Sequence, residues 1–222
     1  MPKNKHIAAF VNDLFDLEPD LILDQIQTLD NRATQFKIAA DSPVAMTLSA
    51  SRIGSLTDGQ NRMLVRVYKD KDSQYFRMYL LSSTNQSSAY VLLSVPGQPN
   101  IFVADSDGQI EIPFSTGIDP LNTIFHLNFP LQVSEIDRFP EDDHQYEIGE
   151  FKYSLDRSAS QLRVELVQSK SVLEASPTKL IVLSKAEHNA FVRLIPLRDF
   201  LAILHLDDSS DFTTGIALCT YS

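Results

Sequence analysis

The feature that most constrains this chain is a run of four strand-like segments between residues 63 and 114. They read MLVRV, YFRMYLLS, AYVLLSV and NIFVADSDGQIEIPF, and short polar joints or joints with Gly and Pro separate them. β-Branched and aromatic residues favour strands, and joints this short favour antiparallel neighbours. The run therefore predicts an antiparallel sheet around which the rest of the chain is organised.

Alternation within the second segment predicts a surface as well as a strand. Apolar side chains at 76, 78 and 80 alternate with a second set, which is Tyr75, Arg77 and Tyr79. The period of two places this second set together on the outer face, where Tyr and Arg are favoured anchors of protein interfaces. The alternative is an ordinary solvent-facing surface whose long side chains lie along the sheet.

The third segment, AYVLLSV, is apolar at nearly every position. A strand of this kind fits the interior of a sheet that is covered on both faces. We therefore expect residues 89–95 to lie centrally.

The fourth segment contains Asp105-Ser-Asp-Gly108, which invites a calcium interpretation. With Gly108 at position six of a twelve-residue calcium loop, Val103 takes position one and Phe114 position twelve, where the loop needs acidic ligands. The Asp-Gly pair is better explained as a hairpin turn that needs a positive φ. No metal site is predicted here.

The first thirty residues show a period of 3.6 instead of two. Apolar residues at 7, 10, 11 and 14 share one helical face, and those at 22, 23, 26 and 29 continue the stripe after Pro19. The pattern predicts a helical hairpin over about 3–30. Its expected role is to cover the sheet, and the alternative is an arm that docks on a partner.

The second half begins a new series of strands at 151–155, 161–169 and 179–184, and the chain ends in another, 211–221. The series loosely echoes the first half, which indicates a duplication of one small β unit. We expect a helical hairpin at 1–30, a first β lobe at 31–118 and a second β lobe at 119–222, with a single domain as the alternative.

The region 185–204 allows two interpretations. Ser184 and Glu187 have the spacing of a capping box, and Pro196 precedes a second helical stripe, so the pattern predicts one or two short helices. A strand over 189–195 is the alternative. The predicted fold class is mainly β (α+β): antiparallel β-sandwich-like lobes, an N-terminal helical hairpin and one or two short helices near the C-terminus.

Charge excludes one class of partner. The net charge is −10, and the segment 135–150 carries seven acids and one Arg. Nucleic-acid binding rests on Lys and Arg that neutralise phosphates, so no nucleic-acid partner is expected. The acidic cluster Glu141, Asp142 and Asp143 is either a solvated loop or a docking surface for a protein partner with a basic surface. A metal site at Asp142, Asp143 and His144 is disfavoured because adjacent residues rarely converge on one ion.

Motifs of catalysis and of cofactor binding are missing from the sequence. The five histidines show no metal-binding spacing, and the chain has no GxSxG elbow, no Walker A loop and no GxGxxG. The single cysteine, Cys219, lies in a strand-like segment and is expected to be a packed thiol. No catalytic residue, cofactor or metal is therefore predicted. The alternative is a hydrolase centred on His205 and Asp207, which share a face if they lie on a strand.

Residues 179–191, KLIVLSKAEHNAF, resemble the strand and capped helix that open the winged-helix transcription regulators. The resemblance implies DNA binding. The chain departs from the family at residues 196–204, PLRDFLAIL, which are mainly apolar with one Arg and one Asp, where a recognition helix is basic.

The function expected from these features is that of a non-catalytic accessory or regulatory protein that binds another protein. No apolar run approaches the length of a membrane-spanning helix, and Asn12 and Asp13 interrupt the N-terminal apolar run, which argues against a secretory signal. A single cysteine agrees with a reducing compartment. A cytoplasmic protein without a membrane segment is therefore expected.

Overall fold

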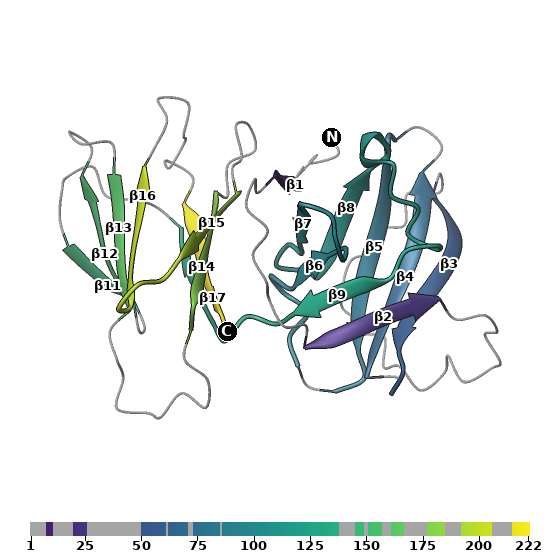
Figure 1. Cartoon of the computed structure of the whole chain (residues 1–222), viewed down its shortest axis with the longest axis horizontal. Helices are drawn as coiled ribbons and strands as arrows, with labels where there is room; N and C mark the ends of the chain where they lie inside the picture. The colour runs from purple at the N-terminus through teal and green to yellow at the C-terminus, as the bar shows by residue number, and fades with distance from the viewer. Residues whose placement is uncertain are drawn as a thin grey trace. The chain divides into compact units, whose positions relative to one another are not determined.

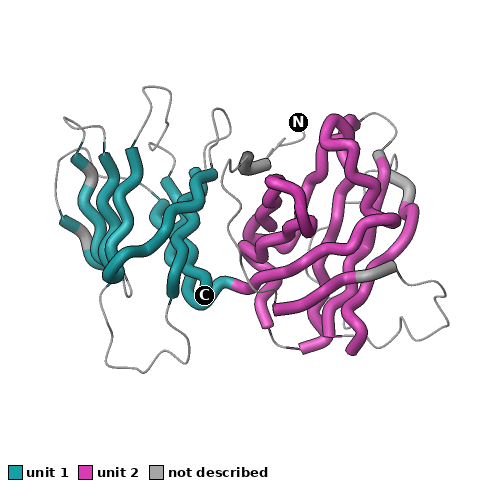
Figure 2. Tube along the Cα trace, viewed as in Figure 1, with its two compact units in different colours: residues 1–6, 130–222 teal, residues 7–129 magenta. Residues whose placement is uncertain are grey.

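The computed structural model describes residues 8–10, 20–25, 50–60, 62–70, 73–84, 86–137, 145–148, 151–156, 161–166, 177–184, 192–205 and 215–222. The chain divides into two compact units, one of residues 7–129 and one of residues 130–222 together with 1–6 (Figure 2). Every strand pair in the described residues is antiparallel. This confirms the prediction of a mainly β protein built from antiparallel sheets.

The unit of residues 7–129 holds one sheet of nine strands, in the order β1-β7-β6-β9-β2-β3-β4-β5-β8 (Figure 1). The strands are β1 (Ala8–Phe10), β2 (Leu21–Gln25), β3 (Ala50–Asp58), β4 (Met63–Asp70), β5 (Tyr75–Ser82), β6 (Leu92–Ser94), β7 (Asn100–Val103), β8 (Gln109–Pro113) and β9 (Phe125–Asn128). A short 3-10 helix, η2 (Phe114–Thr116), follows β8. β6 lies inside the sheet and residues 90–93 are buried, as the apolar segment predicted.

This sheet curls around its own core. β8, at one end of the strand order, contacts β7 and β1 at the other end. The inner face gathers apolar residues from the eight strands β2 to β9 into one cluster, because the side chains of a strand point alternately to its two faces. The most enclosed members include Leu23, Leu56, Val65, Met78, Leu93, Phe102, Ile112, Phe125 and Leu127.

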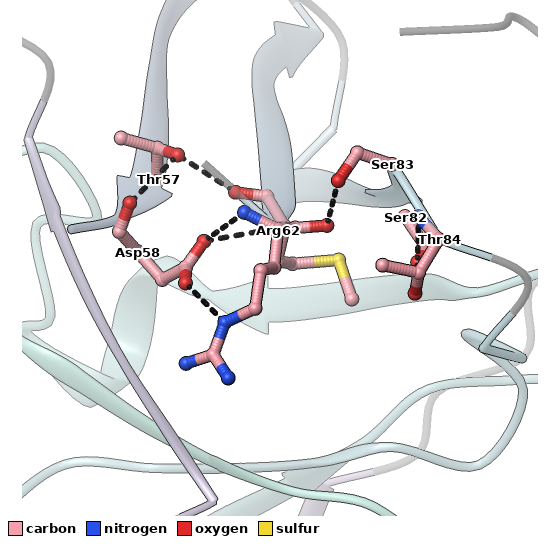
Figure 3. A network of polar contacts seen from close by, with 7 residues as sticks. Thr57, Asp58, Arg62, Ser82, Ser83 and Thr84 are labelled. Carbon is pink, nitrogen blue, oxygen red and sulfur yellow. Dashed lines mark hydrogen bonds and ion pairs between the residues drawn. The ribbon is translucent and has the colours of Figure 1, made fainter. Parts of the chain in front are cut away.

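A network of polar contacts holds the turn between β3 and β4 (Figure 3). The Asp58 carboxylate is buried and accepts hydrogen bonds from the backbone N–H groups of Arg62 (2.6 Å) and Met63 (2.8 Å). Its other oxygen accepts the Arg62 Nε–H at 3.0 Å. Ser83, just after β5, donates to the Arg62 carbonyl through its backbone N–H and its hydroxyl. The network therefore ties three consecutive strands together at one end.

The turn between β7 and β8 has the geometry that the Asp-Gly pair predicted. Gly108 adopts a φ of +75°. Asp105 Oδ1 accepts the backbone N–H groups of Asp107 and Gln109, both at 2.9 Å. The carboxylate of Asp105 thus closes the turn by hydrogen bonds to the backbone.

The unit of residues 130–222 contains two sheets of four strands (Figure 1). The first has the order β10-β17-β14-β15 and the second has the order β11-β12-β13-β16. The strands are β10 (Gln132–Ile136), β11 (Gln145–Ile148), β12 (Phe151–Asp156), β13 (Gln161–Leu166), β14 (Lys179–Ser184), β15 (Val192–Pro196), β16 (Leu201–His205) and β17 (Ile216–Tyr221). The strand orders of the two units differ, and the duplication stays a prediction.

Side chains from both sheets of this unit form a second core. It combines Leu180, Val182, Ile216 and Leu218 of the first sheet with Phe151, Tyr153, Leu162, Val164 and Leu204 of the second. Every residue of β14 and β17 is buried, so these two inner strands are covered on both faces. Cys219 lies fully buried in β17, and burial raises the pKa of its thiol far above its usual value. This confirms the prediction of a packed thiol.

The predicted N-terminal helical hairpin is wrong for the residues that the structure describes. Residues 8–10 and 21–25 of the predicted span form β1 and β2, while 1–7, 11–19 and 26–30 lie outside the described residues. β2 pairs with β9 and β3, so its backbone is held in two ladders. Leu21 and Leu23 enter the core while Ile22 is 51% exposed, which is the period of a strand.

The predicted helices near the C-terminus are also not found in the described residues. Residues 192–205 form β15, a tight corner and β16, and residues 185–191 lie outside the described part. Asp199 and Phe200 take positive φ values of 51° and 63°, which a continuing helix does not allow. β15 pairs with β14, so a strand stands where the winged-helix resemblance requires the helix to continue.

The described residues contain no helix whose length and apolar character would let it cross a membrane.

Candidate functional site

Two rows of side chains cross the outer face of strands β3, β4, β5 and β8. The ladder registers place Arg52, Tyr68, Arg77 and Glu111 in one row, and Ser55, Arg66, Tyr79 and Gln109 in the next. Tyr75 follows on β5, opposite Pro113. We call this surface the Arg/Tyr face, and it comprises Arg52, Ser55, Arg66, Tyr68, Tyr75, Arg77, Tyr79, Gln109 and Glu111.

The alternation of each strand explains why these residues share a face. On β5, Met78 and Leu80 are buried in the core and Phe76 packs against it. The side chains between them must point to the opposite side of the sheet. The alternation predicted for residues 75–81 is therefore confirmed, and Tyr75, Arg77 and Tyr79 lie on one surface.

An ion pair orients the central arginine of the Arg/Tyr face. Arg77 Nε lies 3.2 Å from Glu111 Oε1 across the β5–β8 ladder. The side chains are 21% and 9% exposed, so both groups are largely withdrawn from water. Gln109 Nε2 also donates to Glu111 Oε1, at 3.4 Å. A guanidinium fixed in this way loses little further conformational entropy when a partner contacts it.

Two tyrosines form the aromatic centre of the same face. The rings of Tyr68 and Tyr79 meet edge to face, with centroids 5.4 Å apart and an interplanar angle of 88°. Burial raises the pKa of the Tyr79 phenol above its usual value, and Arg77 only partly offsets this. The nearby Tyr68, Glu111 and Asp105 raise it further. Tyr79 therefore remains a neutral hydroxyl group at physiological pH.

The other two arginines differ from Arg77 in their partners. Arg52 is exposed, and its Nη2 donates to Ser55 Oγ at 2.7 Å. Arg66 is partly buried, and within the described part of the chain its buried Nε has no hydrogen-bond partner. A buried donor without an acceptor costs free energy.

The Arg/Tyr face has a charge opposite in sign to that of the whole chain. Five Lys and Arg side chains are described in the unit of residues 7–129, and three of them belong to this face. Six Asp and Glu side chains are described there, and Glu111 alone belongs to it. The face therefore carries a local positive charge in a chain whose net charge is −10.

Six residues of this face were not singled out from the sequence: Arg52, Ser55, Arg66, Tyr68, Gln109 and Glu111. Arg66 and Tyr68 follow the same alternation in MLVRVYKD that identified Arg77 and Tyr79, so the sequence did hold a signal for them. Glu111 reaches Arg77 through a ladder between β5 and β8, which are separated in the chain by β6 and β7. No local pattern predicts such a pairing.

The remaining predicted site residues are not brought into this face. Glu141, Asp142, Asp143 and Asp207 lie outside the described residues. His205 is exposed on β16, and its Nδ1 lies 3.4 Å from Gln161 Nε2. The hydrolase centred on His205 and Asp207 therefore stays a prediction. Among the described residues, no group of three or more His, Cys, Asp or Glu side chains could hold a metal ion.

Comparison with known proteins adds no relative to this description. No protein-family model, no curated protein and no solved structure matches the chain. The candidate function therefore rests on the geometry of the Arg/Tyr face.

Proposed function

We propose that this protein is a non-catalytic accessory or regulatory protein that acts by binding another protein, with the Arg/Tyr face as a contact surface. The observation that carries the proposal is the arrangement of Tyr68, Tyr79 and Arg77 at the centre of that face. Tyrosine and arginine dominate the binding energy of protein interfaces, especially where they cluster and are partly desolvated. These three residues meet that description.

Rigidity of the scaffold supports the same proposal. The inner side of β4, β5 and β8 packs into the core through fully buried residues such as Val65, Met78 and Ile112. The Arg77–Glu111 ion pair then fixes the outer side. A surface that is ordered before binding avoids part of the entropic cost of association.

The acidic segment 135–150 supplies a second contact in this proposal, to a protein partner with a basic surface. The described residues of the segment include three exposed acids, Glu135, Asp137 and Glu147. Glu147 pairs with Lys152 at 3.0 Å, a contact between exposed groups that contributes little to stability. Exposed acids of this kind would steer a basic partner and make its binding depend on salt.

The test is capture of one stoichiometric partner by the purified, tagged chain, followed by measurement of the affinity. Tyr79→Ala should weaken binding at least about tenfold, since truncation removes an aromatic anchor. Reversal of charge at Glu141, Asp142 and Asp143 should also weaken binding of the partner, and this loss should become smaller as the salt concentration rises. Ile203→Ala is the matched control, because Ile203 is 45% exposed on the other unit.

Thermal unfolding of each variant separates loss of binding from loss of the fold. The proposal is refuted if no partner is recovered. It is also refuted if the partner binds the Tyr79→Ala variant with the same affinity as the unchanged chain.

A further inference from the structure

We propose that the Arg/Tyr face takes an acidic, extended peptide segment of the protein partner, whose carboxylates bind Arg52 and Arg66. The inference rests on the proposed function and names the partner chemistry for this face alone. A face that carries three arginines and one glutamate favours a ligand of opposite charge. The basic partner surface proposed above belongs to the separate acidic segment 135–150.

Arg52 and Arg66 differ from Arg77 in the hydrogen-bond donors that they offer a ligand. Arg77 already directs its Nε to Glu111. Among the described residues, the partly buried Arg66 makes no side-chain hydrogen bond, and the exposed Arg52 makes one, to Ser55. A guanidinium presents five donors in a fixed fork that matches the two oxygens of a carboxylate. Arg52 and Arg66 therefore retain donors for a ligand.

The placement of these arginines matches the repeat of an extended chain. Arg52 stands opposite Tyr68, and Arg66 precedes Tyr68 by two residues on the same strand. Arg52 and Arg66 are thus diagonal neighbours across β3 and β4, a relation that separates Cα atoms by about 7–8 Å. Side chains at positions i and i+2 of an extended peptide lie about 6.6 Å apart on one face. Two acids separated by one residue would therefore reach both arginines.

The tyrosines give the site a donor and an apolar flank between the charges. Tyr68 is 8% exposed and lies between Arg52 and Arg77 in its row, while Tyr79 lies beside Arg66 in the next. The neutral Tyr79 phenol can donate a hydrogen bond to a carboxylate, and its partly exposed ring can cover the backbone of an extended segment. The face thus offers guanidinium groups for the carboxylates of an acidic peptide and an aromatic ring for its backbone.

A nucleic acid is the other anionic polymer that such a face could attract, and we do not favour it. The chain carries a net charge of −10, so a polyphosphate would be repelled by most of the protein. A short peptide segment with two carboxylates meets only the local positive charge.

The test measures fluorescence anisotropy of labelled probes with the chain of residues 1–222 at low ionic strength. The probes are the peptides (Glu-Gly)5, (Lys-Gly)5 and (Ser-Gly)5, with a ten-nucleotide oligothymidylate as the competing anion. We expect binding of (Glu-Gly)5 alone among the peptides, with little displacement by the oligonucleotide. Raising the salt concentration from about 50 mM to about 200 mM should weaken the binding of (Glu-Gly)5.

Arginine variants locate that binding. Arg52→Gln and Arg66→Gln should each lower the affinity for (Glu-Gly)5 about tenfold, which is the effect of losing one charge-assisted hydrogen-bonded pair. Arg163→Gln is the matched control, since Arg163 is exposed on β13 and the change in charge is identical. Arg52→Glu should bind (Lys-Gly)5 better than the unchanged chain does, a gain that misfolding cannot produce.

Three results would overturn the inference: no binding of (Glu-Gly)5, equal affinity in the Gln variants and the control, or tighter binding of the oligonucleotide through the same arginines. Its failure is distinct from that of the proposed function. If a captured partner binds through Tyr79 but is insensitive to Arg52→Gln and Arg66→Gln, the face binds a protein that is not acidic there. If no partner is captured and (Glu-Gly)5 still binds through these arginines, the proposed function fails and the chemistry of the face stands.

Discussion

Asp58 and Arg77 are charged side chains with little exposure, and each is stabilised in a different way. Asp58 accepts two backbone N–H groups and one guanidinium N–H at the β3–β4 turn. Arg77 instead pairs with a carboxylate on the neighbouring strand, on the outer face. Removal of one member of a buried, hydrogen-bonded set leaves the others without partners, and that loss costs more than the set contributes. Asp58 therefore stabilises the fold, while Arg77 also shapes a surface.

The stability that Asp58 contributes should depend on pH. Burial acts to raise the pKa of its carboxyl, but hydrogen bonds from Met63 and Arg62 outweigh burial and hold the pKa below its usual 3.8. Because the folded state then binds the proton less readily than the unfolded state, this stabilisation is complete above about pH 4 and is lost as the pH falls through the folded pKa. Asp58→Ala should lower the free energy of unfolding by about 2–3 kcal/mol at pH 7, and by less below pH 4.

Urea unfolding at a series of pH values measures this difference. Asp107→Ala provides the control, since Asp107 is an exposed aspartate of the same unit and the change in charge is equal. A destabilisation by Asp58→Ala that matched the control, or that did not shrink in acid, would contradict this account of the turn.

At the scale of elements, strands with an unbroken alternation or a continuous apolar run were predictable, and a strand with an interrupted pattern was not. β4, β5, β13 and β14 fall within segments whose alternation or continuous apolar character stands out in the sequence. β3 contains Gly54 and a register shift between Arg52 and Gly54, so its pattern is interrupted. That interruption also concealed Arg52 as a member of the Arg/Tyr face.

The two wrong helical predictions share a physical cause. Residues 22 and 23 fit a helical stripe with residues further along, yet Leu23 alone of the two is buried. Ladders with β9 and β3 supply the backbone hydrogen bonds that a helix would have made internally. At the other end of the chain, β15 and β16 are likewise fixed by β14 and β13. Pairing with distant strands outweighs a weak local preference, and a single sequence does not contain the pairing.

The turn that joins β7 to β8 yields a prediction about packing. Gly97 and Gly108 both have a φ of +75°, but a methyl group at Gly97 would meet nothing within 4 Å, whereas one at Gly108 would lie 2.8 Å from Ser88 Cβ. An alanine at either position meets the cost of a left-handed conformation, about 1–2 kcal/mol. Gly108→Ala should lower the free energy of unfolding by about 1 kcal/mol more than Gly97→Ala does, because it also overpacks the turn.

A double-mutant cycle separates the two contributions in chemical unfolding. In the Ser88→Gly background, which lacks the obstructing Cβ, the cost of Gly108→Ala should fall to that of Gly97→Ala. An unchanged cost in that background would show that the backbone conformation, and not Ser88, makes glycine necessary.

At the scale of the whole molecule, each of the two compact units has its own hydrophobic core. A core of this kind is the basis for independent folding. The sequence does not mark the place where one unit ends, because prolines lie on both sides of β9 (Phe125–Asn128). Either group of prolines could belong to the connection between the units. Its pairing with β2 and β6 assigns β9 to the unit of residues 7–129.

Matched substitutions in the two cores test this division. Leu93 and Leu218 are both fully buried, one in each core, and Leu→Ala at such a site costs about 2–5 kcal/mol. Hydrogen exchange followed by mass spectrometry should show that Leu93→Ala lowers protection within residues 7–129 only, and Leu218→Ala within residues 130–222 only. Peptides that cover 119–129 decide the boundary, since the β9 pairings require them to respond to Leu93→Ala. Equal loss of protection in both units with either variant would mean that the chain unfolds as one cooperative body, and its two cores would then not be separate folding units.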